Sequence, residues 1–324
     1  MEILSQKVLN SIPVNKKPVN YLMNILNIGR RSAARKAMGA TPFTFEEVVE
    51  LSLKLNFSID EITKKSVGNG ESLSDLQQKN LSAADKHFFI SHMNYFDMIE
   101  SLSKAKEVEI ICSLNRIYSF FIVNFDKLFK FYYYLWTNQC DGISSNLSFS
   151  EIELPSFIDL IRRKSKSTIA TVNNITFILD QYIFMRLIRE LQYHYNLKLI
   201  SHEELTEIKN DIVNFLDLIE EQMQTGTNKD GYARYFYLSP LDVERSSMYG
   251  TFDGKIISRH DLRFNIPVNT EQNDLTKVHK NKINSLKRSS ILISQSNEIV
   301  QASFLNQQRE YIKMITQDLI FYYG

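Results

Sequence analysis

Apolar and polar residues follow a helical period through much of the first 65 positions. After Pro18 the apolar side chains recur at spacings of three and four, which places them on one side of a helix: Val19, Leu22, Met23 and Leu26. Proline is well tolerated as the first residue of a helix, so we expect this helix to begin at Pro18. Another short helix is predicted ahead of it, over residues 3–9.

The next predicted helix, over residues 30–38, separates its residues by character. Its basic and polar residues fall on one side of the helical axis: Arg31, Ser32, Arg35 and Lys36. Its small and apolar residues fall on the other side: Ala33, Ala34, Ala37 and Met38. Gly39 is placed to end the helix.

Two capping boxes mark the following helix starts. Thr44 is followed three positions later by Glu47, and Ser58 by Glu61. Between them an apolar stripe, Val48, Leu51 and Leu55, predicts a buried helix face. A basic helix that follows a tight turn, within five short helices in about 65 residues, is the layout of a helix-turn-helix domain.

The N-terminal segment resembles the phage-repressor-like helix-turn-helix proteins of the Cro and repressor type. The resemblance covers about 50 of 324 residues and depends on residues 22–28, the basic helix ending at Gly39, residues 42–47 and residues 55–61. In that family the helix that corresponds to residues 30–38 enters the DNA major groove, and the one that corresponds to residues 18–26 lies across the backbone.

The resemblance and the charge pattern together nominate seven DNA-binding residues: Lys16, Lys17, Arg30, Arg31, Ser32, Arg35 and Lys36. The recognition helix departs from the family in its alanines, which replace long polar side chains. Alanine can touch a thymine methyl group but forms no hydrogen bond with a base, so base specificity would depend mainly on the two arginines and Ser32. Shape-based readout stays open, as does a helical protein-interaction module with a solvated basic face.

The composition changes after residue 62, where residues 66–75 form a polar, glycine-containing stretch typical of a linker. We therefore expect three parts: a DNA-binding domain over residues 1–66, a linker and connecting helix over residues 67–110, and a sensing and oligomerisation domain over residues 111–324.

Helical patterns dominate the remainder. Helices are predicted over residues 76–105, 126–139, 182–195, 202–223, 271–287 and 297–319. Residues 118–136 hold ten of the 38 aromatic residues, so helix 126–139 is expected to be a central core helix, with an aromatic ligand pocket or subunit interface as the sharper alternative. Residues 169–179 fit either a strand or the start of a helix.

Strand patterns appear late in the chain. Residues 232–238 have strand composition, and residues 248–252 and 255–258 flank Asp253 and Gly254, a strong hairpin signal. A short extended piece follows at residues 290–293. The fold class expected is therefore mixed: an all-α helix-turn-helix domain, then a larger, mainly helical α+β domain with a small antiparallel sheet.

Composition and charge narrow the possible fold classes and cellular compartments. The 16 glycines and prolines in 324 residues favour a mostly helical chain. With no long apolar stretch and no signal-peptide pattern, we expect a cytosolic protein without a membrane partner. Cys112 and Cys140 lack metal-ligand spacing, so neither a disulfide framework nor a zinc site is expected. The net charge is +1, but residues 1–40 carry seven basic residues against one acid, a net +6 that leaves −5 for the rest.

No catalytic motif, metal site or cofactor fingerprint is recognisable. His87 and His92 lie on different sides of a helix and make a poor metal pair. The run containing Arg259, His260, Asp261 and Arg263 could line an anion site or form a solvated loop.

We therefore expect a sequence-specific DNA-binding transcriptional regulator, without enzymatic activity, that acts as a homodimer on double-stranded DNA. The C-terminal domain would sense a ligand or partner and supply the dimer surface, through helix 297–319 or the helix that starts near residue 76. It resembles the companion domains of bacterial regulators only vaguely. A partner-binding scaffold, or an enzyme in the C-terminal domain, remains the alternative.

Overall fold

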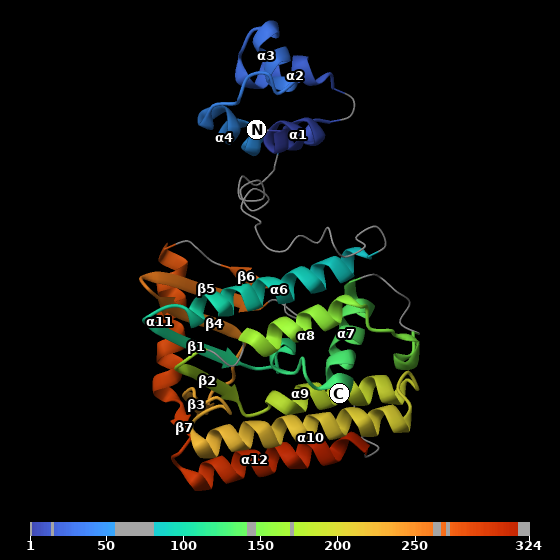
Figure 1. Ribbon diagram of the computed structural model, residues 1–324, viewed down its shortest axis with the longest axis vertical. Helices are drawn as coiled ribbons and strands as arrows, with labels where there is room; N and C mark the ends of the chain where they lie inside the picture. The colour runs from blue at the N-terminus through green and yellow to red at the C-terminus, as the bar shows by residue number, and fades with distance from the viewer. Residues whose placement is uncertain are drawn as a thin grey trace. The chain divides into compact units, whose positions relative to one another are not determined.

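The chain divides into two compact units, Met1–Gln78 and Lys79–Gly324. The computed structural model (Figure 1) describes residues 2–13, 16–55, 81–140, 147–168, 172–261, 267–269 and 273–316. The capping box of Ser58 and Glu61 and the linker pattern at 66–75 lie outside these residues. The expected connecting segment 67–110 is divided between the units, because its helix α6 (Ala83–Ser103) packs inside the second unit against α8 (Phe157–Thr168).

The described part of the first unit contains four of the five predicted helices, and the fifth prediction lies outside the described residues. The four are α1 (Glu2–Ser11), α2 (Pro18–Leu26), α3 (Arg30–Ala37) and α4 (Phe45–Leu55). Their apolar stripes meet in one small core made of Val8, Ile12, Leu22, Leu26, Ala33 and Leu51. Helix α2 begins at Pro18 as expected, and the capping box of α4 is formed: Glu47 Oε2 accepts the Thr44 N–H at 2.7 Å, and Thr44 Oγ1 accepts the Glu47 N–H at 3.3 Å.

The second unit is built on a seven-stranded mixed sheet with the order β6-β5-β4-β1-β2-β3-β7. Its strands are β1 (Val108–Leu114), β2 (Ile175–Asp180), β3 (Arg234–Ser239), β4 (Ser247–Phe252), β5 (Lys255–Asp261), β6 (Pro267–Asn269) and β7 (Ile291–Leu292). The central strands β1, β2 and β3 are parallel, and the others pair antiparallel. The expectation of a small, purely antiparallel sheet is therefore wrong, although the β4–β5 hairpin within it is confirmed.

The burial of the parallel strands explains why the sequence did not predict this sheet. All six residues of β2 are buried, as are the last five of β1. Strands covered on both faces lose the alternating pattern that marks a half-buried strand, and their sequences read as continuous apolar runs. Helices make the crossovers from β1 to β2 and from β2 to β3, which parallel strands require.

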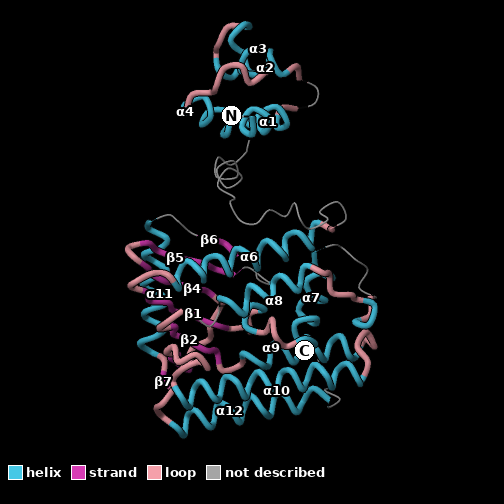
Figure 2. Tube along the Cα trace, viewed as in Figure 1, coloured by secondary structure: helices cyan, strands magenta, loops and turns pink. Residues whose placement is uncertain are grey.

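The sheet forms a middle layer between helices (Figure 2). Helix α11 (Asn273–Ser289) lies on one face, where Ile283 packs with Ile111, Ile178 and Tyr249. The other long helices gather on the opposite side: α6, α7 (Asp126–Cys140), α8, α9 (Ile183–Asn196), α10 (His202–Thr225) and α12 (Glu298–Lys313). Short 3-10 turns occur at Ser119–Phe121, Phe149–Glu151 and Met314–Thr316. Among the described residues, no helix has the length and apolarity that crossing a bilayer requires.

Helix α7 is the central core helix that its aromatics predicted. Phe129, Phe131 and Tyr134 are fully buried, and the indole N–H of Trp136 donates to the Ala84 carbonyl at 3.0 Å. Of the stretch left open at 169–179, residues 175–179 belong to strand β2, and residues 169–171 lie outside the described residues. At the start of α12, Ile299 is 88% exposed.

Strand β4 approaches β1 closely at Gly250. A Cβ atom at this position would lie 2.9 Å from the Glu109 carbonyl oxygen, which belongs to the backbone of the neighbouring strand and cannot move aside cheaply. We predict that Gly250→Ala lowers the free energy of unfolding of the second unit by about 1–3 kcal/mol. Urea unfolding followed by the fluorescence of Trp136, the one tryptophan of the chain, measures this unit selectively. Thr251→Ala, one position further along β4, is the control and should cost less; equal costs would contradict the steric explanation.

Candidate nucleic-acid interface

Helix α3 presents a narrow exposed stripe of mixed character. Arg31 and Arg35 are exposed, Met38 just after the helix is 75% exposed, and Ala34 is half-buried between them. These residues occupy the i, i+3, i+4 and i+7 positions of one helix face. Arg30 is also exposed at the helix start. The outward face therefore combines guanidinium groups with small or flexible apolar side chains.

A three-residue turn, Asn27 to Gly29, sets the direction of α3. Asn27 ends α2 in the left-handed conformation, with φ 50°, and its N–H bonds to the Met23 carbonyl. Gly29 is extended and precedes the first residue of α3. Ala33 is completely buried on the inner side of α3, and its small side chain lets α3 pack closely against the core of the unit.

Lys36 does not belong to the exposed face. It is only 5% exposed; its Nζ donates to Glu47 Oε2 at 2.7 Å and to the Pro42 carbonyl at 2.8 Å. Its ammonium group also lies 5.4 Å from the centre of the Phe43 ring. Lys36 therefore connects α3 to the start of α4, and we remove it from the candidate contact residues. Ser32 is half-buried, at the margin of the exposed stripe.

The remaining candidates carry free positive charge. Lys16 and Lys17 are exposed just before α2, and Lys17 is the N-cap residue of that helix. Arg30, Arg31 and Arg35 form no ion pair with the residues described here. Between Glu2 and Glu46 the sequence contains no acidic residue. Apart from Lys36, which pairs with Glu47, the described basic side chains of this stretch are exposed and available to an anionic partner.

We predict opposite roles for the neighbours Lys36 and Arg35. Lys36→Ala leaves the Glu47 carboxylate without its buried cation and should destabilise the α3–α4 pair by about 2–4 kcal/mol. Arg35→Ala, at an exposed position, should change stability by less than about 0.5 kcal/mol. Amide hydrogen exchange of α3 and α4 measures both effects locally; equal protection in the two variants would contradict the structural role of Lys36.

The second unit contains a buried serine–histidine cluster that sequence reasoning missed. His279 of α11 contacts Ser247 Oγ of β4 through Nε2 at 3.0 Å and Ser258 Oγ of β5 through Nδ1 at 2.8 Å. Ser113 Oγ lies 2.9 Å from Ser247 Oγ. These side chains are at most 6% exposed, so their hydroxyl groups are shielded from a substrate and the cluster fixes α11 to the sheet. The partners lie 21 and 32 positions from His279, a separation that gives no local sequence signal.

The polar run after the hairpin is part of strand β5 and does not form one site. Alternation along the strand places Arg259 and Asp261 on the face toward α6 and His260 on the face toward α11. The Arg259 guanidinium lies 5.3 Å from the Tyr95 ring centre, and its Nε donates to Asp261 Oδ1 at 3.4 Å. Burial raises the pKa of Asp261, and the neighbouring guanidinium opposes that shift. The solvated-loop interpretation is wrong for residues 259–261, and Arg263 lies outside the described residues.

The two histidines of α6 have separate environments. His87 is exposed beside the Trp136 ring, whereas His92 is fully buried between the Phe88 carbonyl at 2.8 Å and Ser119 Oγ at 2.7 Å. Among the described residues no group of three or more histidine, cysteine, aspartate or glutamate side chains is arranged to hold a metal ion. Cys112 is a buried free thiol on β1.

The buried histidines predict acid sensitivity of the second unit. Burial lowers the pKa of His92 to about 4 and that of His279 to about 4. In the unfolded chain a histidine titrates near ~6.5, so between that pH and about 4 the unfolded state binds more protons. Stability is therefore full above about pH 6.5 and falls as the pH drops, by up to about 1.4 kcal/mol per pH unit for each histidine.

Urea unfolding followed by Trp136 fluorescence at several pH values checks this. His279→Gln should lower stability at neutral pH and make the pH dependence shallower. His202→Gln changes a surface residue at the start of α10 and is the control. It should leave the pH dependence of stability unchanged. An unchanged slope in His279→Gln would contradict the assignment.

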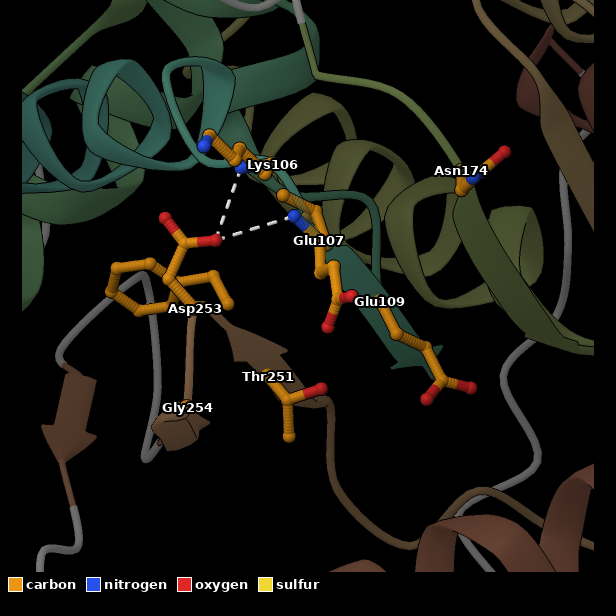
Figure 3. Close-up of a pocket in the computed structure, with 9 residues that line it drawn as sticks. Lys106, Glu107, Glu109, Asn174, Thr251, Asp253 and Gly254 are labelled. Atoms are coloured by element: carbon orange, nitrogen blue, oxygen red, sulfur yellow. Dashed lines mark hydrogen bonds between the residues drawn. The ribbon is translucent and has the colours of Figure 1, made fainter.

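A polar pocket of about 390 Å³ lies at one end of the sheet (Figure 3). It is lined by Lys106, Glu107, Val108, Glu109, Asn174, Thr251, Phe252, Asp253 and Gly254. Asp253 Oδ1 accepts the backbone N–H groups of Lys106 and Glu107 at 3.0 and 3.3 Å, so its carboxylate braces the hairpin turn against the start of β1. Three of its nine lining residues carry carboxylates, and none of the nine belongs to α7.

Comparison with family models, with characterised proteins and with solved structures gave no match to this chain. Its function must therefore be inferred from its own residues. The part with the clearest chemical character is the basic surface of the first unit, formed by Lys16, Lys17, Arg30, Arg31 and Arg35.

Proposed function

We propose that this protein is a transcriptional regulator that binds double-stranded DNA through a helix-turn-helix formed by α2 and α3. The observation that carries the proposal is the exposed stripe of α3. Its two arginines form no ion pair within the described part of the chain and lie in a stretch that lacks acidic residues. Polyanion binding needs such uncompensated cations, because each contact gains from the release of counterions from the phosphates.

The size of α3 suits a major groove. An α-helix with its side chains is about 10–12 Å in diameter, similar to the ~12 Å width of the major groove in B-form DNA. Arg31 and Arg35 are one turn apart on the same face, and arginine reads guanine through two hydrogen bonds to O6 and N7. The apolar members of the stripe, Ala34 and Met38, can contact thymine methyl groups.

Contacts with the DNA backbone are assigned to the residues around the turn and at the start of α2. The first-turn N–H groups of a helix carry partial positive charge and bind phosphate, and Lys16 and Lys17 lie at that end of α2. Arg30, beside the turn, can add a further phosphate contact. These contacts position the domain without reading sequence.

The second unit is proposed as the sensing part of the regulator. Its well-packed aromatic interior and its mixed sheet form a domain far larger than DNA binding requires. A small-molecule effector and a protein partner remain alternative inputs. Experiments decide between the proposal and its two alternatives. If duplex DNA binding does not depend on salt, the scaffold alternative is favoured. If the full chain turns over a metabolite, the enzyme alternative is favoured.

Measurement starts by selecting bound duplexes from a random-sequence pool with the full-length chain. Affinity for the selected duplex should fall steeply between about 50 and 200 mM salt. Arg31→Ala or Arg35→Ala should cost about 1–3 kcal/mol per half-site and relax the preference at one base pair. Lys17→Ala should weaken all duplexes equally and reduce the salt slope by about 1.

Lys229→Ala, which removes an exposed lysine from the second unit, is the matched control and should leave binding unchanged. The proposal fails if the folded full-length protein binds no duplex at about 50 mM salt, or if Lys229→Ala weakens binding as much as Lys17→Ala. If the arginine variants lose the same affinity for every duplex sequence, the DNA-binding proposal stands but base readout by α3 is rejected.

A further inference from the structure

Helix α11, which covers the face of the sheet opposite the other long helices (Figure 1), carries several cations on one flank. At 100° per residue, these cations fall within one sector of about 100° around the helix axis: Lys277, Lys280, Lys287 and Arg288. Lys277, Lys280 and Arg288 are exposed. Lys287 is half-buried, with its Nζ 5.4 Å from the centre of the Tyr237 ring. We call these four residues the basic face of α11.

The positive charge of α11 is not compensated. None of its three exposed cations on this face forms an ion pair within the described part of the chain. The helix holds five cations and one acid, Asp274 in its first turn, which gives a net charge of +4. Residues 41–324 together carry −5, so the rest of that stretch carries −9. A concentration of positive charge in an otherwise acidic stretch indicates a surface for an anionic partner.

The inner side of α11 holds the basic face in place. There His279 contacts Ser247 Oγ at 3.0 Å and Ser258 Oγ at 2.8 Å, and Ile283 packs against the sheet. A helix fixed by such buried contacts needs no rearrangement of its backbone to meet a partner. The entropy cost of binding is lower for a surface that is already ordered.

The residues around the cations favour a polar polyanion over a bilayer surface. Asn284 lies within the basic sector and the exposed Asn281 at its edge, and asparagine side chains donate hydrogen bonds to phosphate oxygens. A helix that binds a bilayer surface instead buries a broad apolar face. The exposed apolar residues of α11, Leu275 and Val278, lie on its other flank, where Lys282 is paired with Glu244 at 2.8 Å.

The basic face is also long enough for several phosphate contacts. Lys277 and Arg288 are eleven residues apart, which corresponds to about 16 Å along the helix axis. Double-stranded DNA carries one negative charge per ~1.7 Å of its length, so a surface of this length lies opposite several phosphates.

We propose that the basic face of α11 is a second DNA-contact surface, which binds the phosphate backbone of double-stranded DNA without reading its sequence. The choice of DNA as the polyanion rests on the function proposed for α3, whereas the assignment of phosphate contacts to α11 does not. The inference gives a direct DNA contact to the unit that is proposed above as the sensing part.

The test measures binding of the full-length protein to a random-sequence duplex by fluorescence anisotropy over a range of salt concentrations. The α11 triple variant combines Lys277→Gln, Lys280→Gln and Arg288→Gln. It should bind about tenfold or more weakly at about 100 mM salt, and its salt slope should be shallower by about 2–3, because each lost phosphate contact removes about 0.9 from the slope.

A matched control removes three exposed cations of the same unit outside α11. It combines Lys86→Gln, Arg163→Gln and Lys229→Gln and should leave the affinity and the salt slope unchanged. Far-UV circular dichroism and Trp136 fluorescence establish that both triple variants fold. Equal losses in the two triple variants would show that net charge, and not the basic face, governs binding, and would overturn the inference.

A variant that combines Arg31→Ala and Arg35→Ala separates this inference from the proposed function. If this arginine variant loses affinity for the selected duplex and the α11 triple variant binds every duplex like the wild type, the inference is overturned and the proposed function stands. If the α11 triple variant loses affinity and the arginine variant does not, the α11 contact stands and the function proposed for α3 fails.

Vesicles of phosphatidylcholine and phosphatidylserine are the second probe, because an anionic bilayer also attracts lysine and arginine side chains. We expect the wild-type chain and the α11 triple variant to sediment with the vesicles to the same extent. If the triple variant loses vesicle binding but keeps the affinity of the wild type for DNA, the basic face contacts a lipid surface and the inference is overturned.

Discussion

The ion pair between Lys36 and Glu47 determines which side of α3 faces outward. Its formation buries the Lys36 side chain between the two helices, which leaves Arg31, Ala34, Arg35 and Met38 on the opposite side. The same Glu47 carboxylate accepts the Thr44 N–H and so fixes the start of α4. One carboxylate thus contributes both to the rotation of α3 and to the beginning of α4, because it pairs with Lys36 and accepts the Thr44 N–H. A buried charge pair is weak as a source of net stability, but it is effective at selecting one arrangement.

Local patterns predicted much of this molecule. The helices of the first unit, the capping box at Thr44 and the β4–β5 hairpin each follow from residues close together in sequence. The rotation of α3 about its axis could not be predicted in this way. Alanines occur on buried and exposed helix faces alike, and a lysine can bury its aliphatic stem, so neither residue type marks the inner face. Strand β1 and the order of the sheet depend on long-range pairing, which no local pattern carries; the His279 cluster was missed for the same reason.

The first unit separates its positive and negative side chains along the chain. Positive side chains lie on α3 and before α2, whereas the acidic residues of α4 begin at Glu46. Phosphates attract the former and repel the latter, so electrostatics favours α3 and disfavours α4 as the DNA-facing helix. Two linked copies of the proposed regulator would bind one duplex with a high effective concentration, because both recognition helices then act on the same molecule. Few base-reading side chains on each α3 then cease to be a disadvantage, because their energies add across the pair.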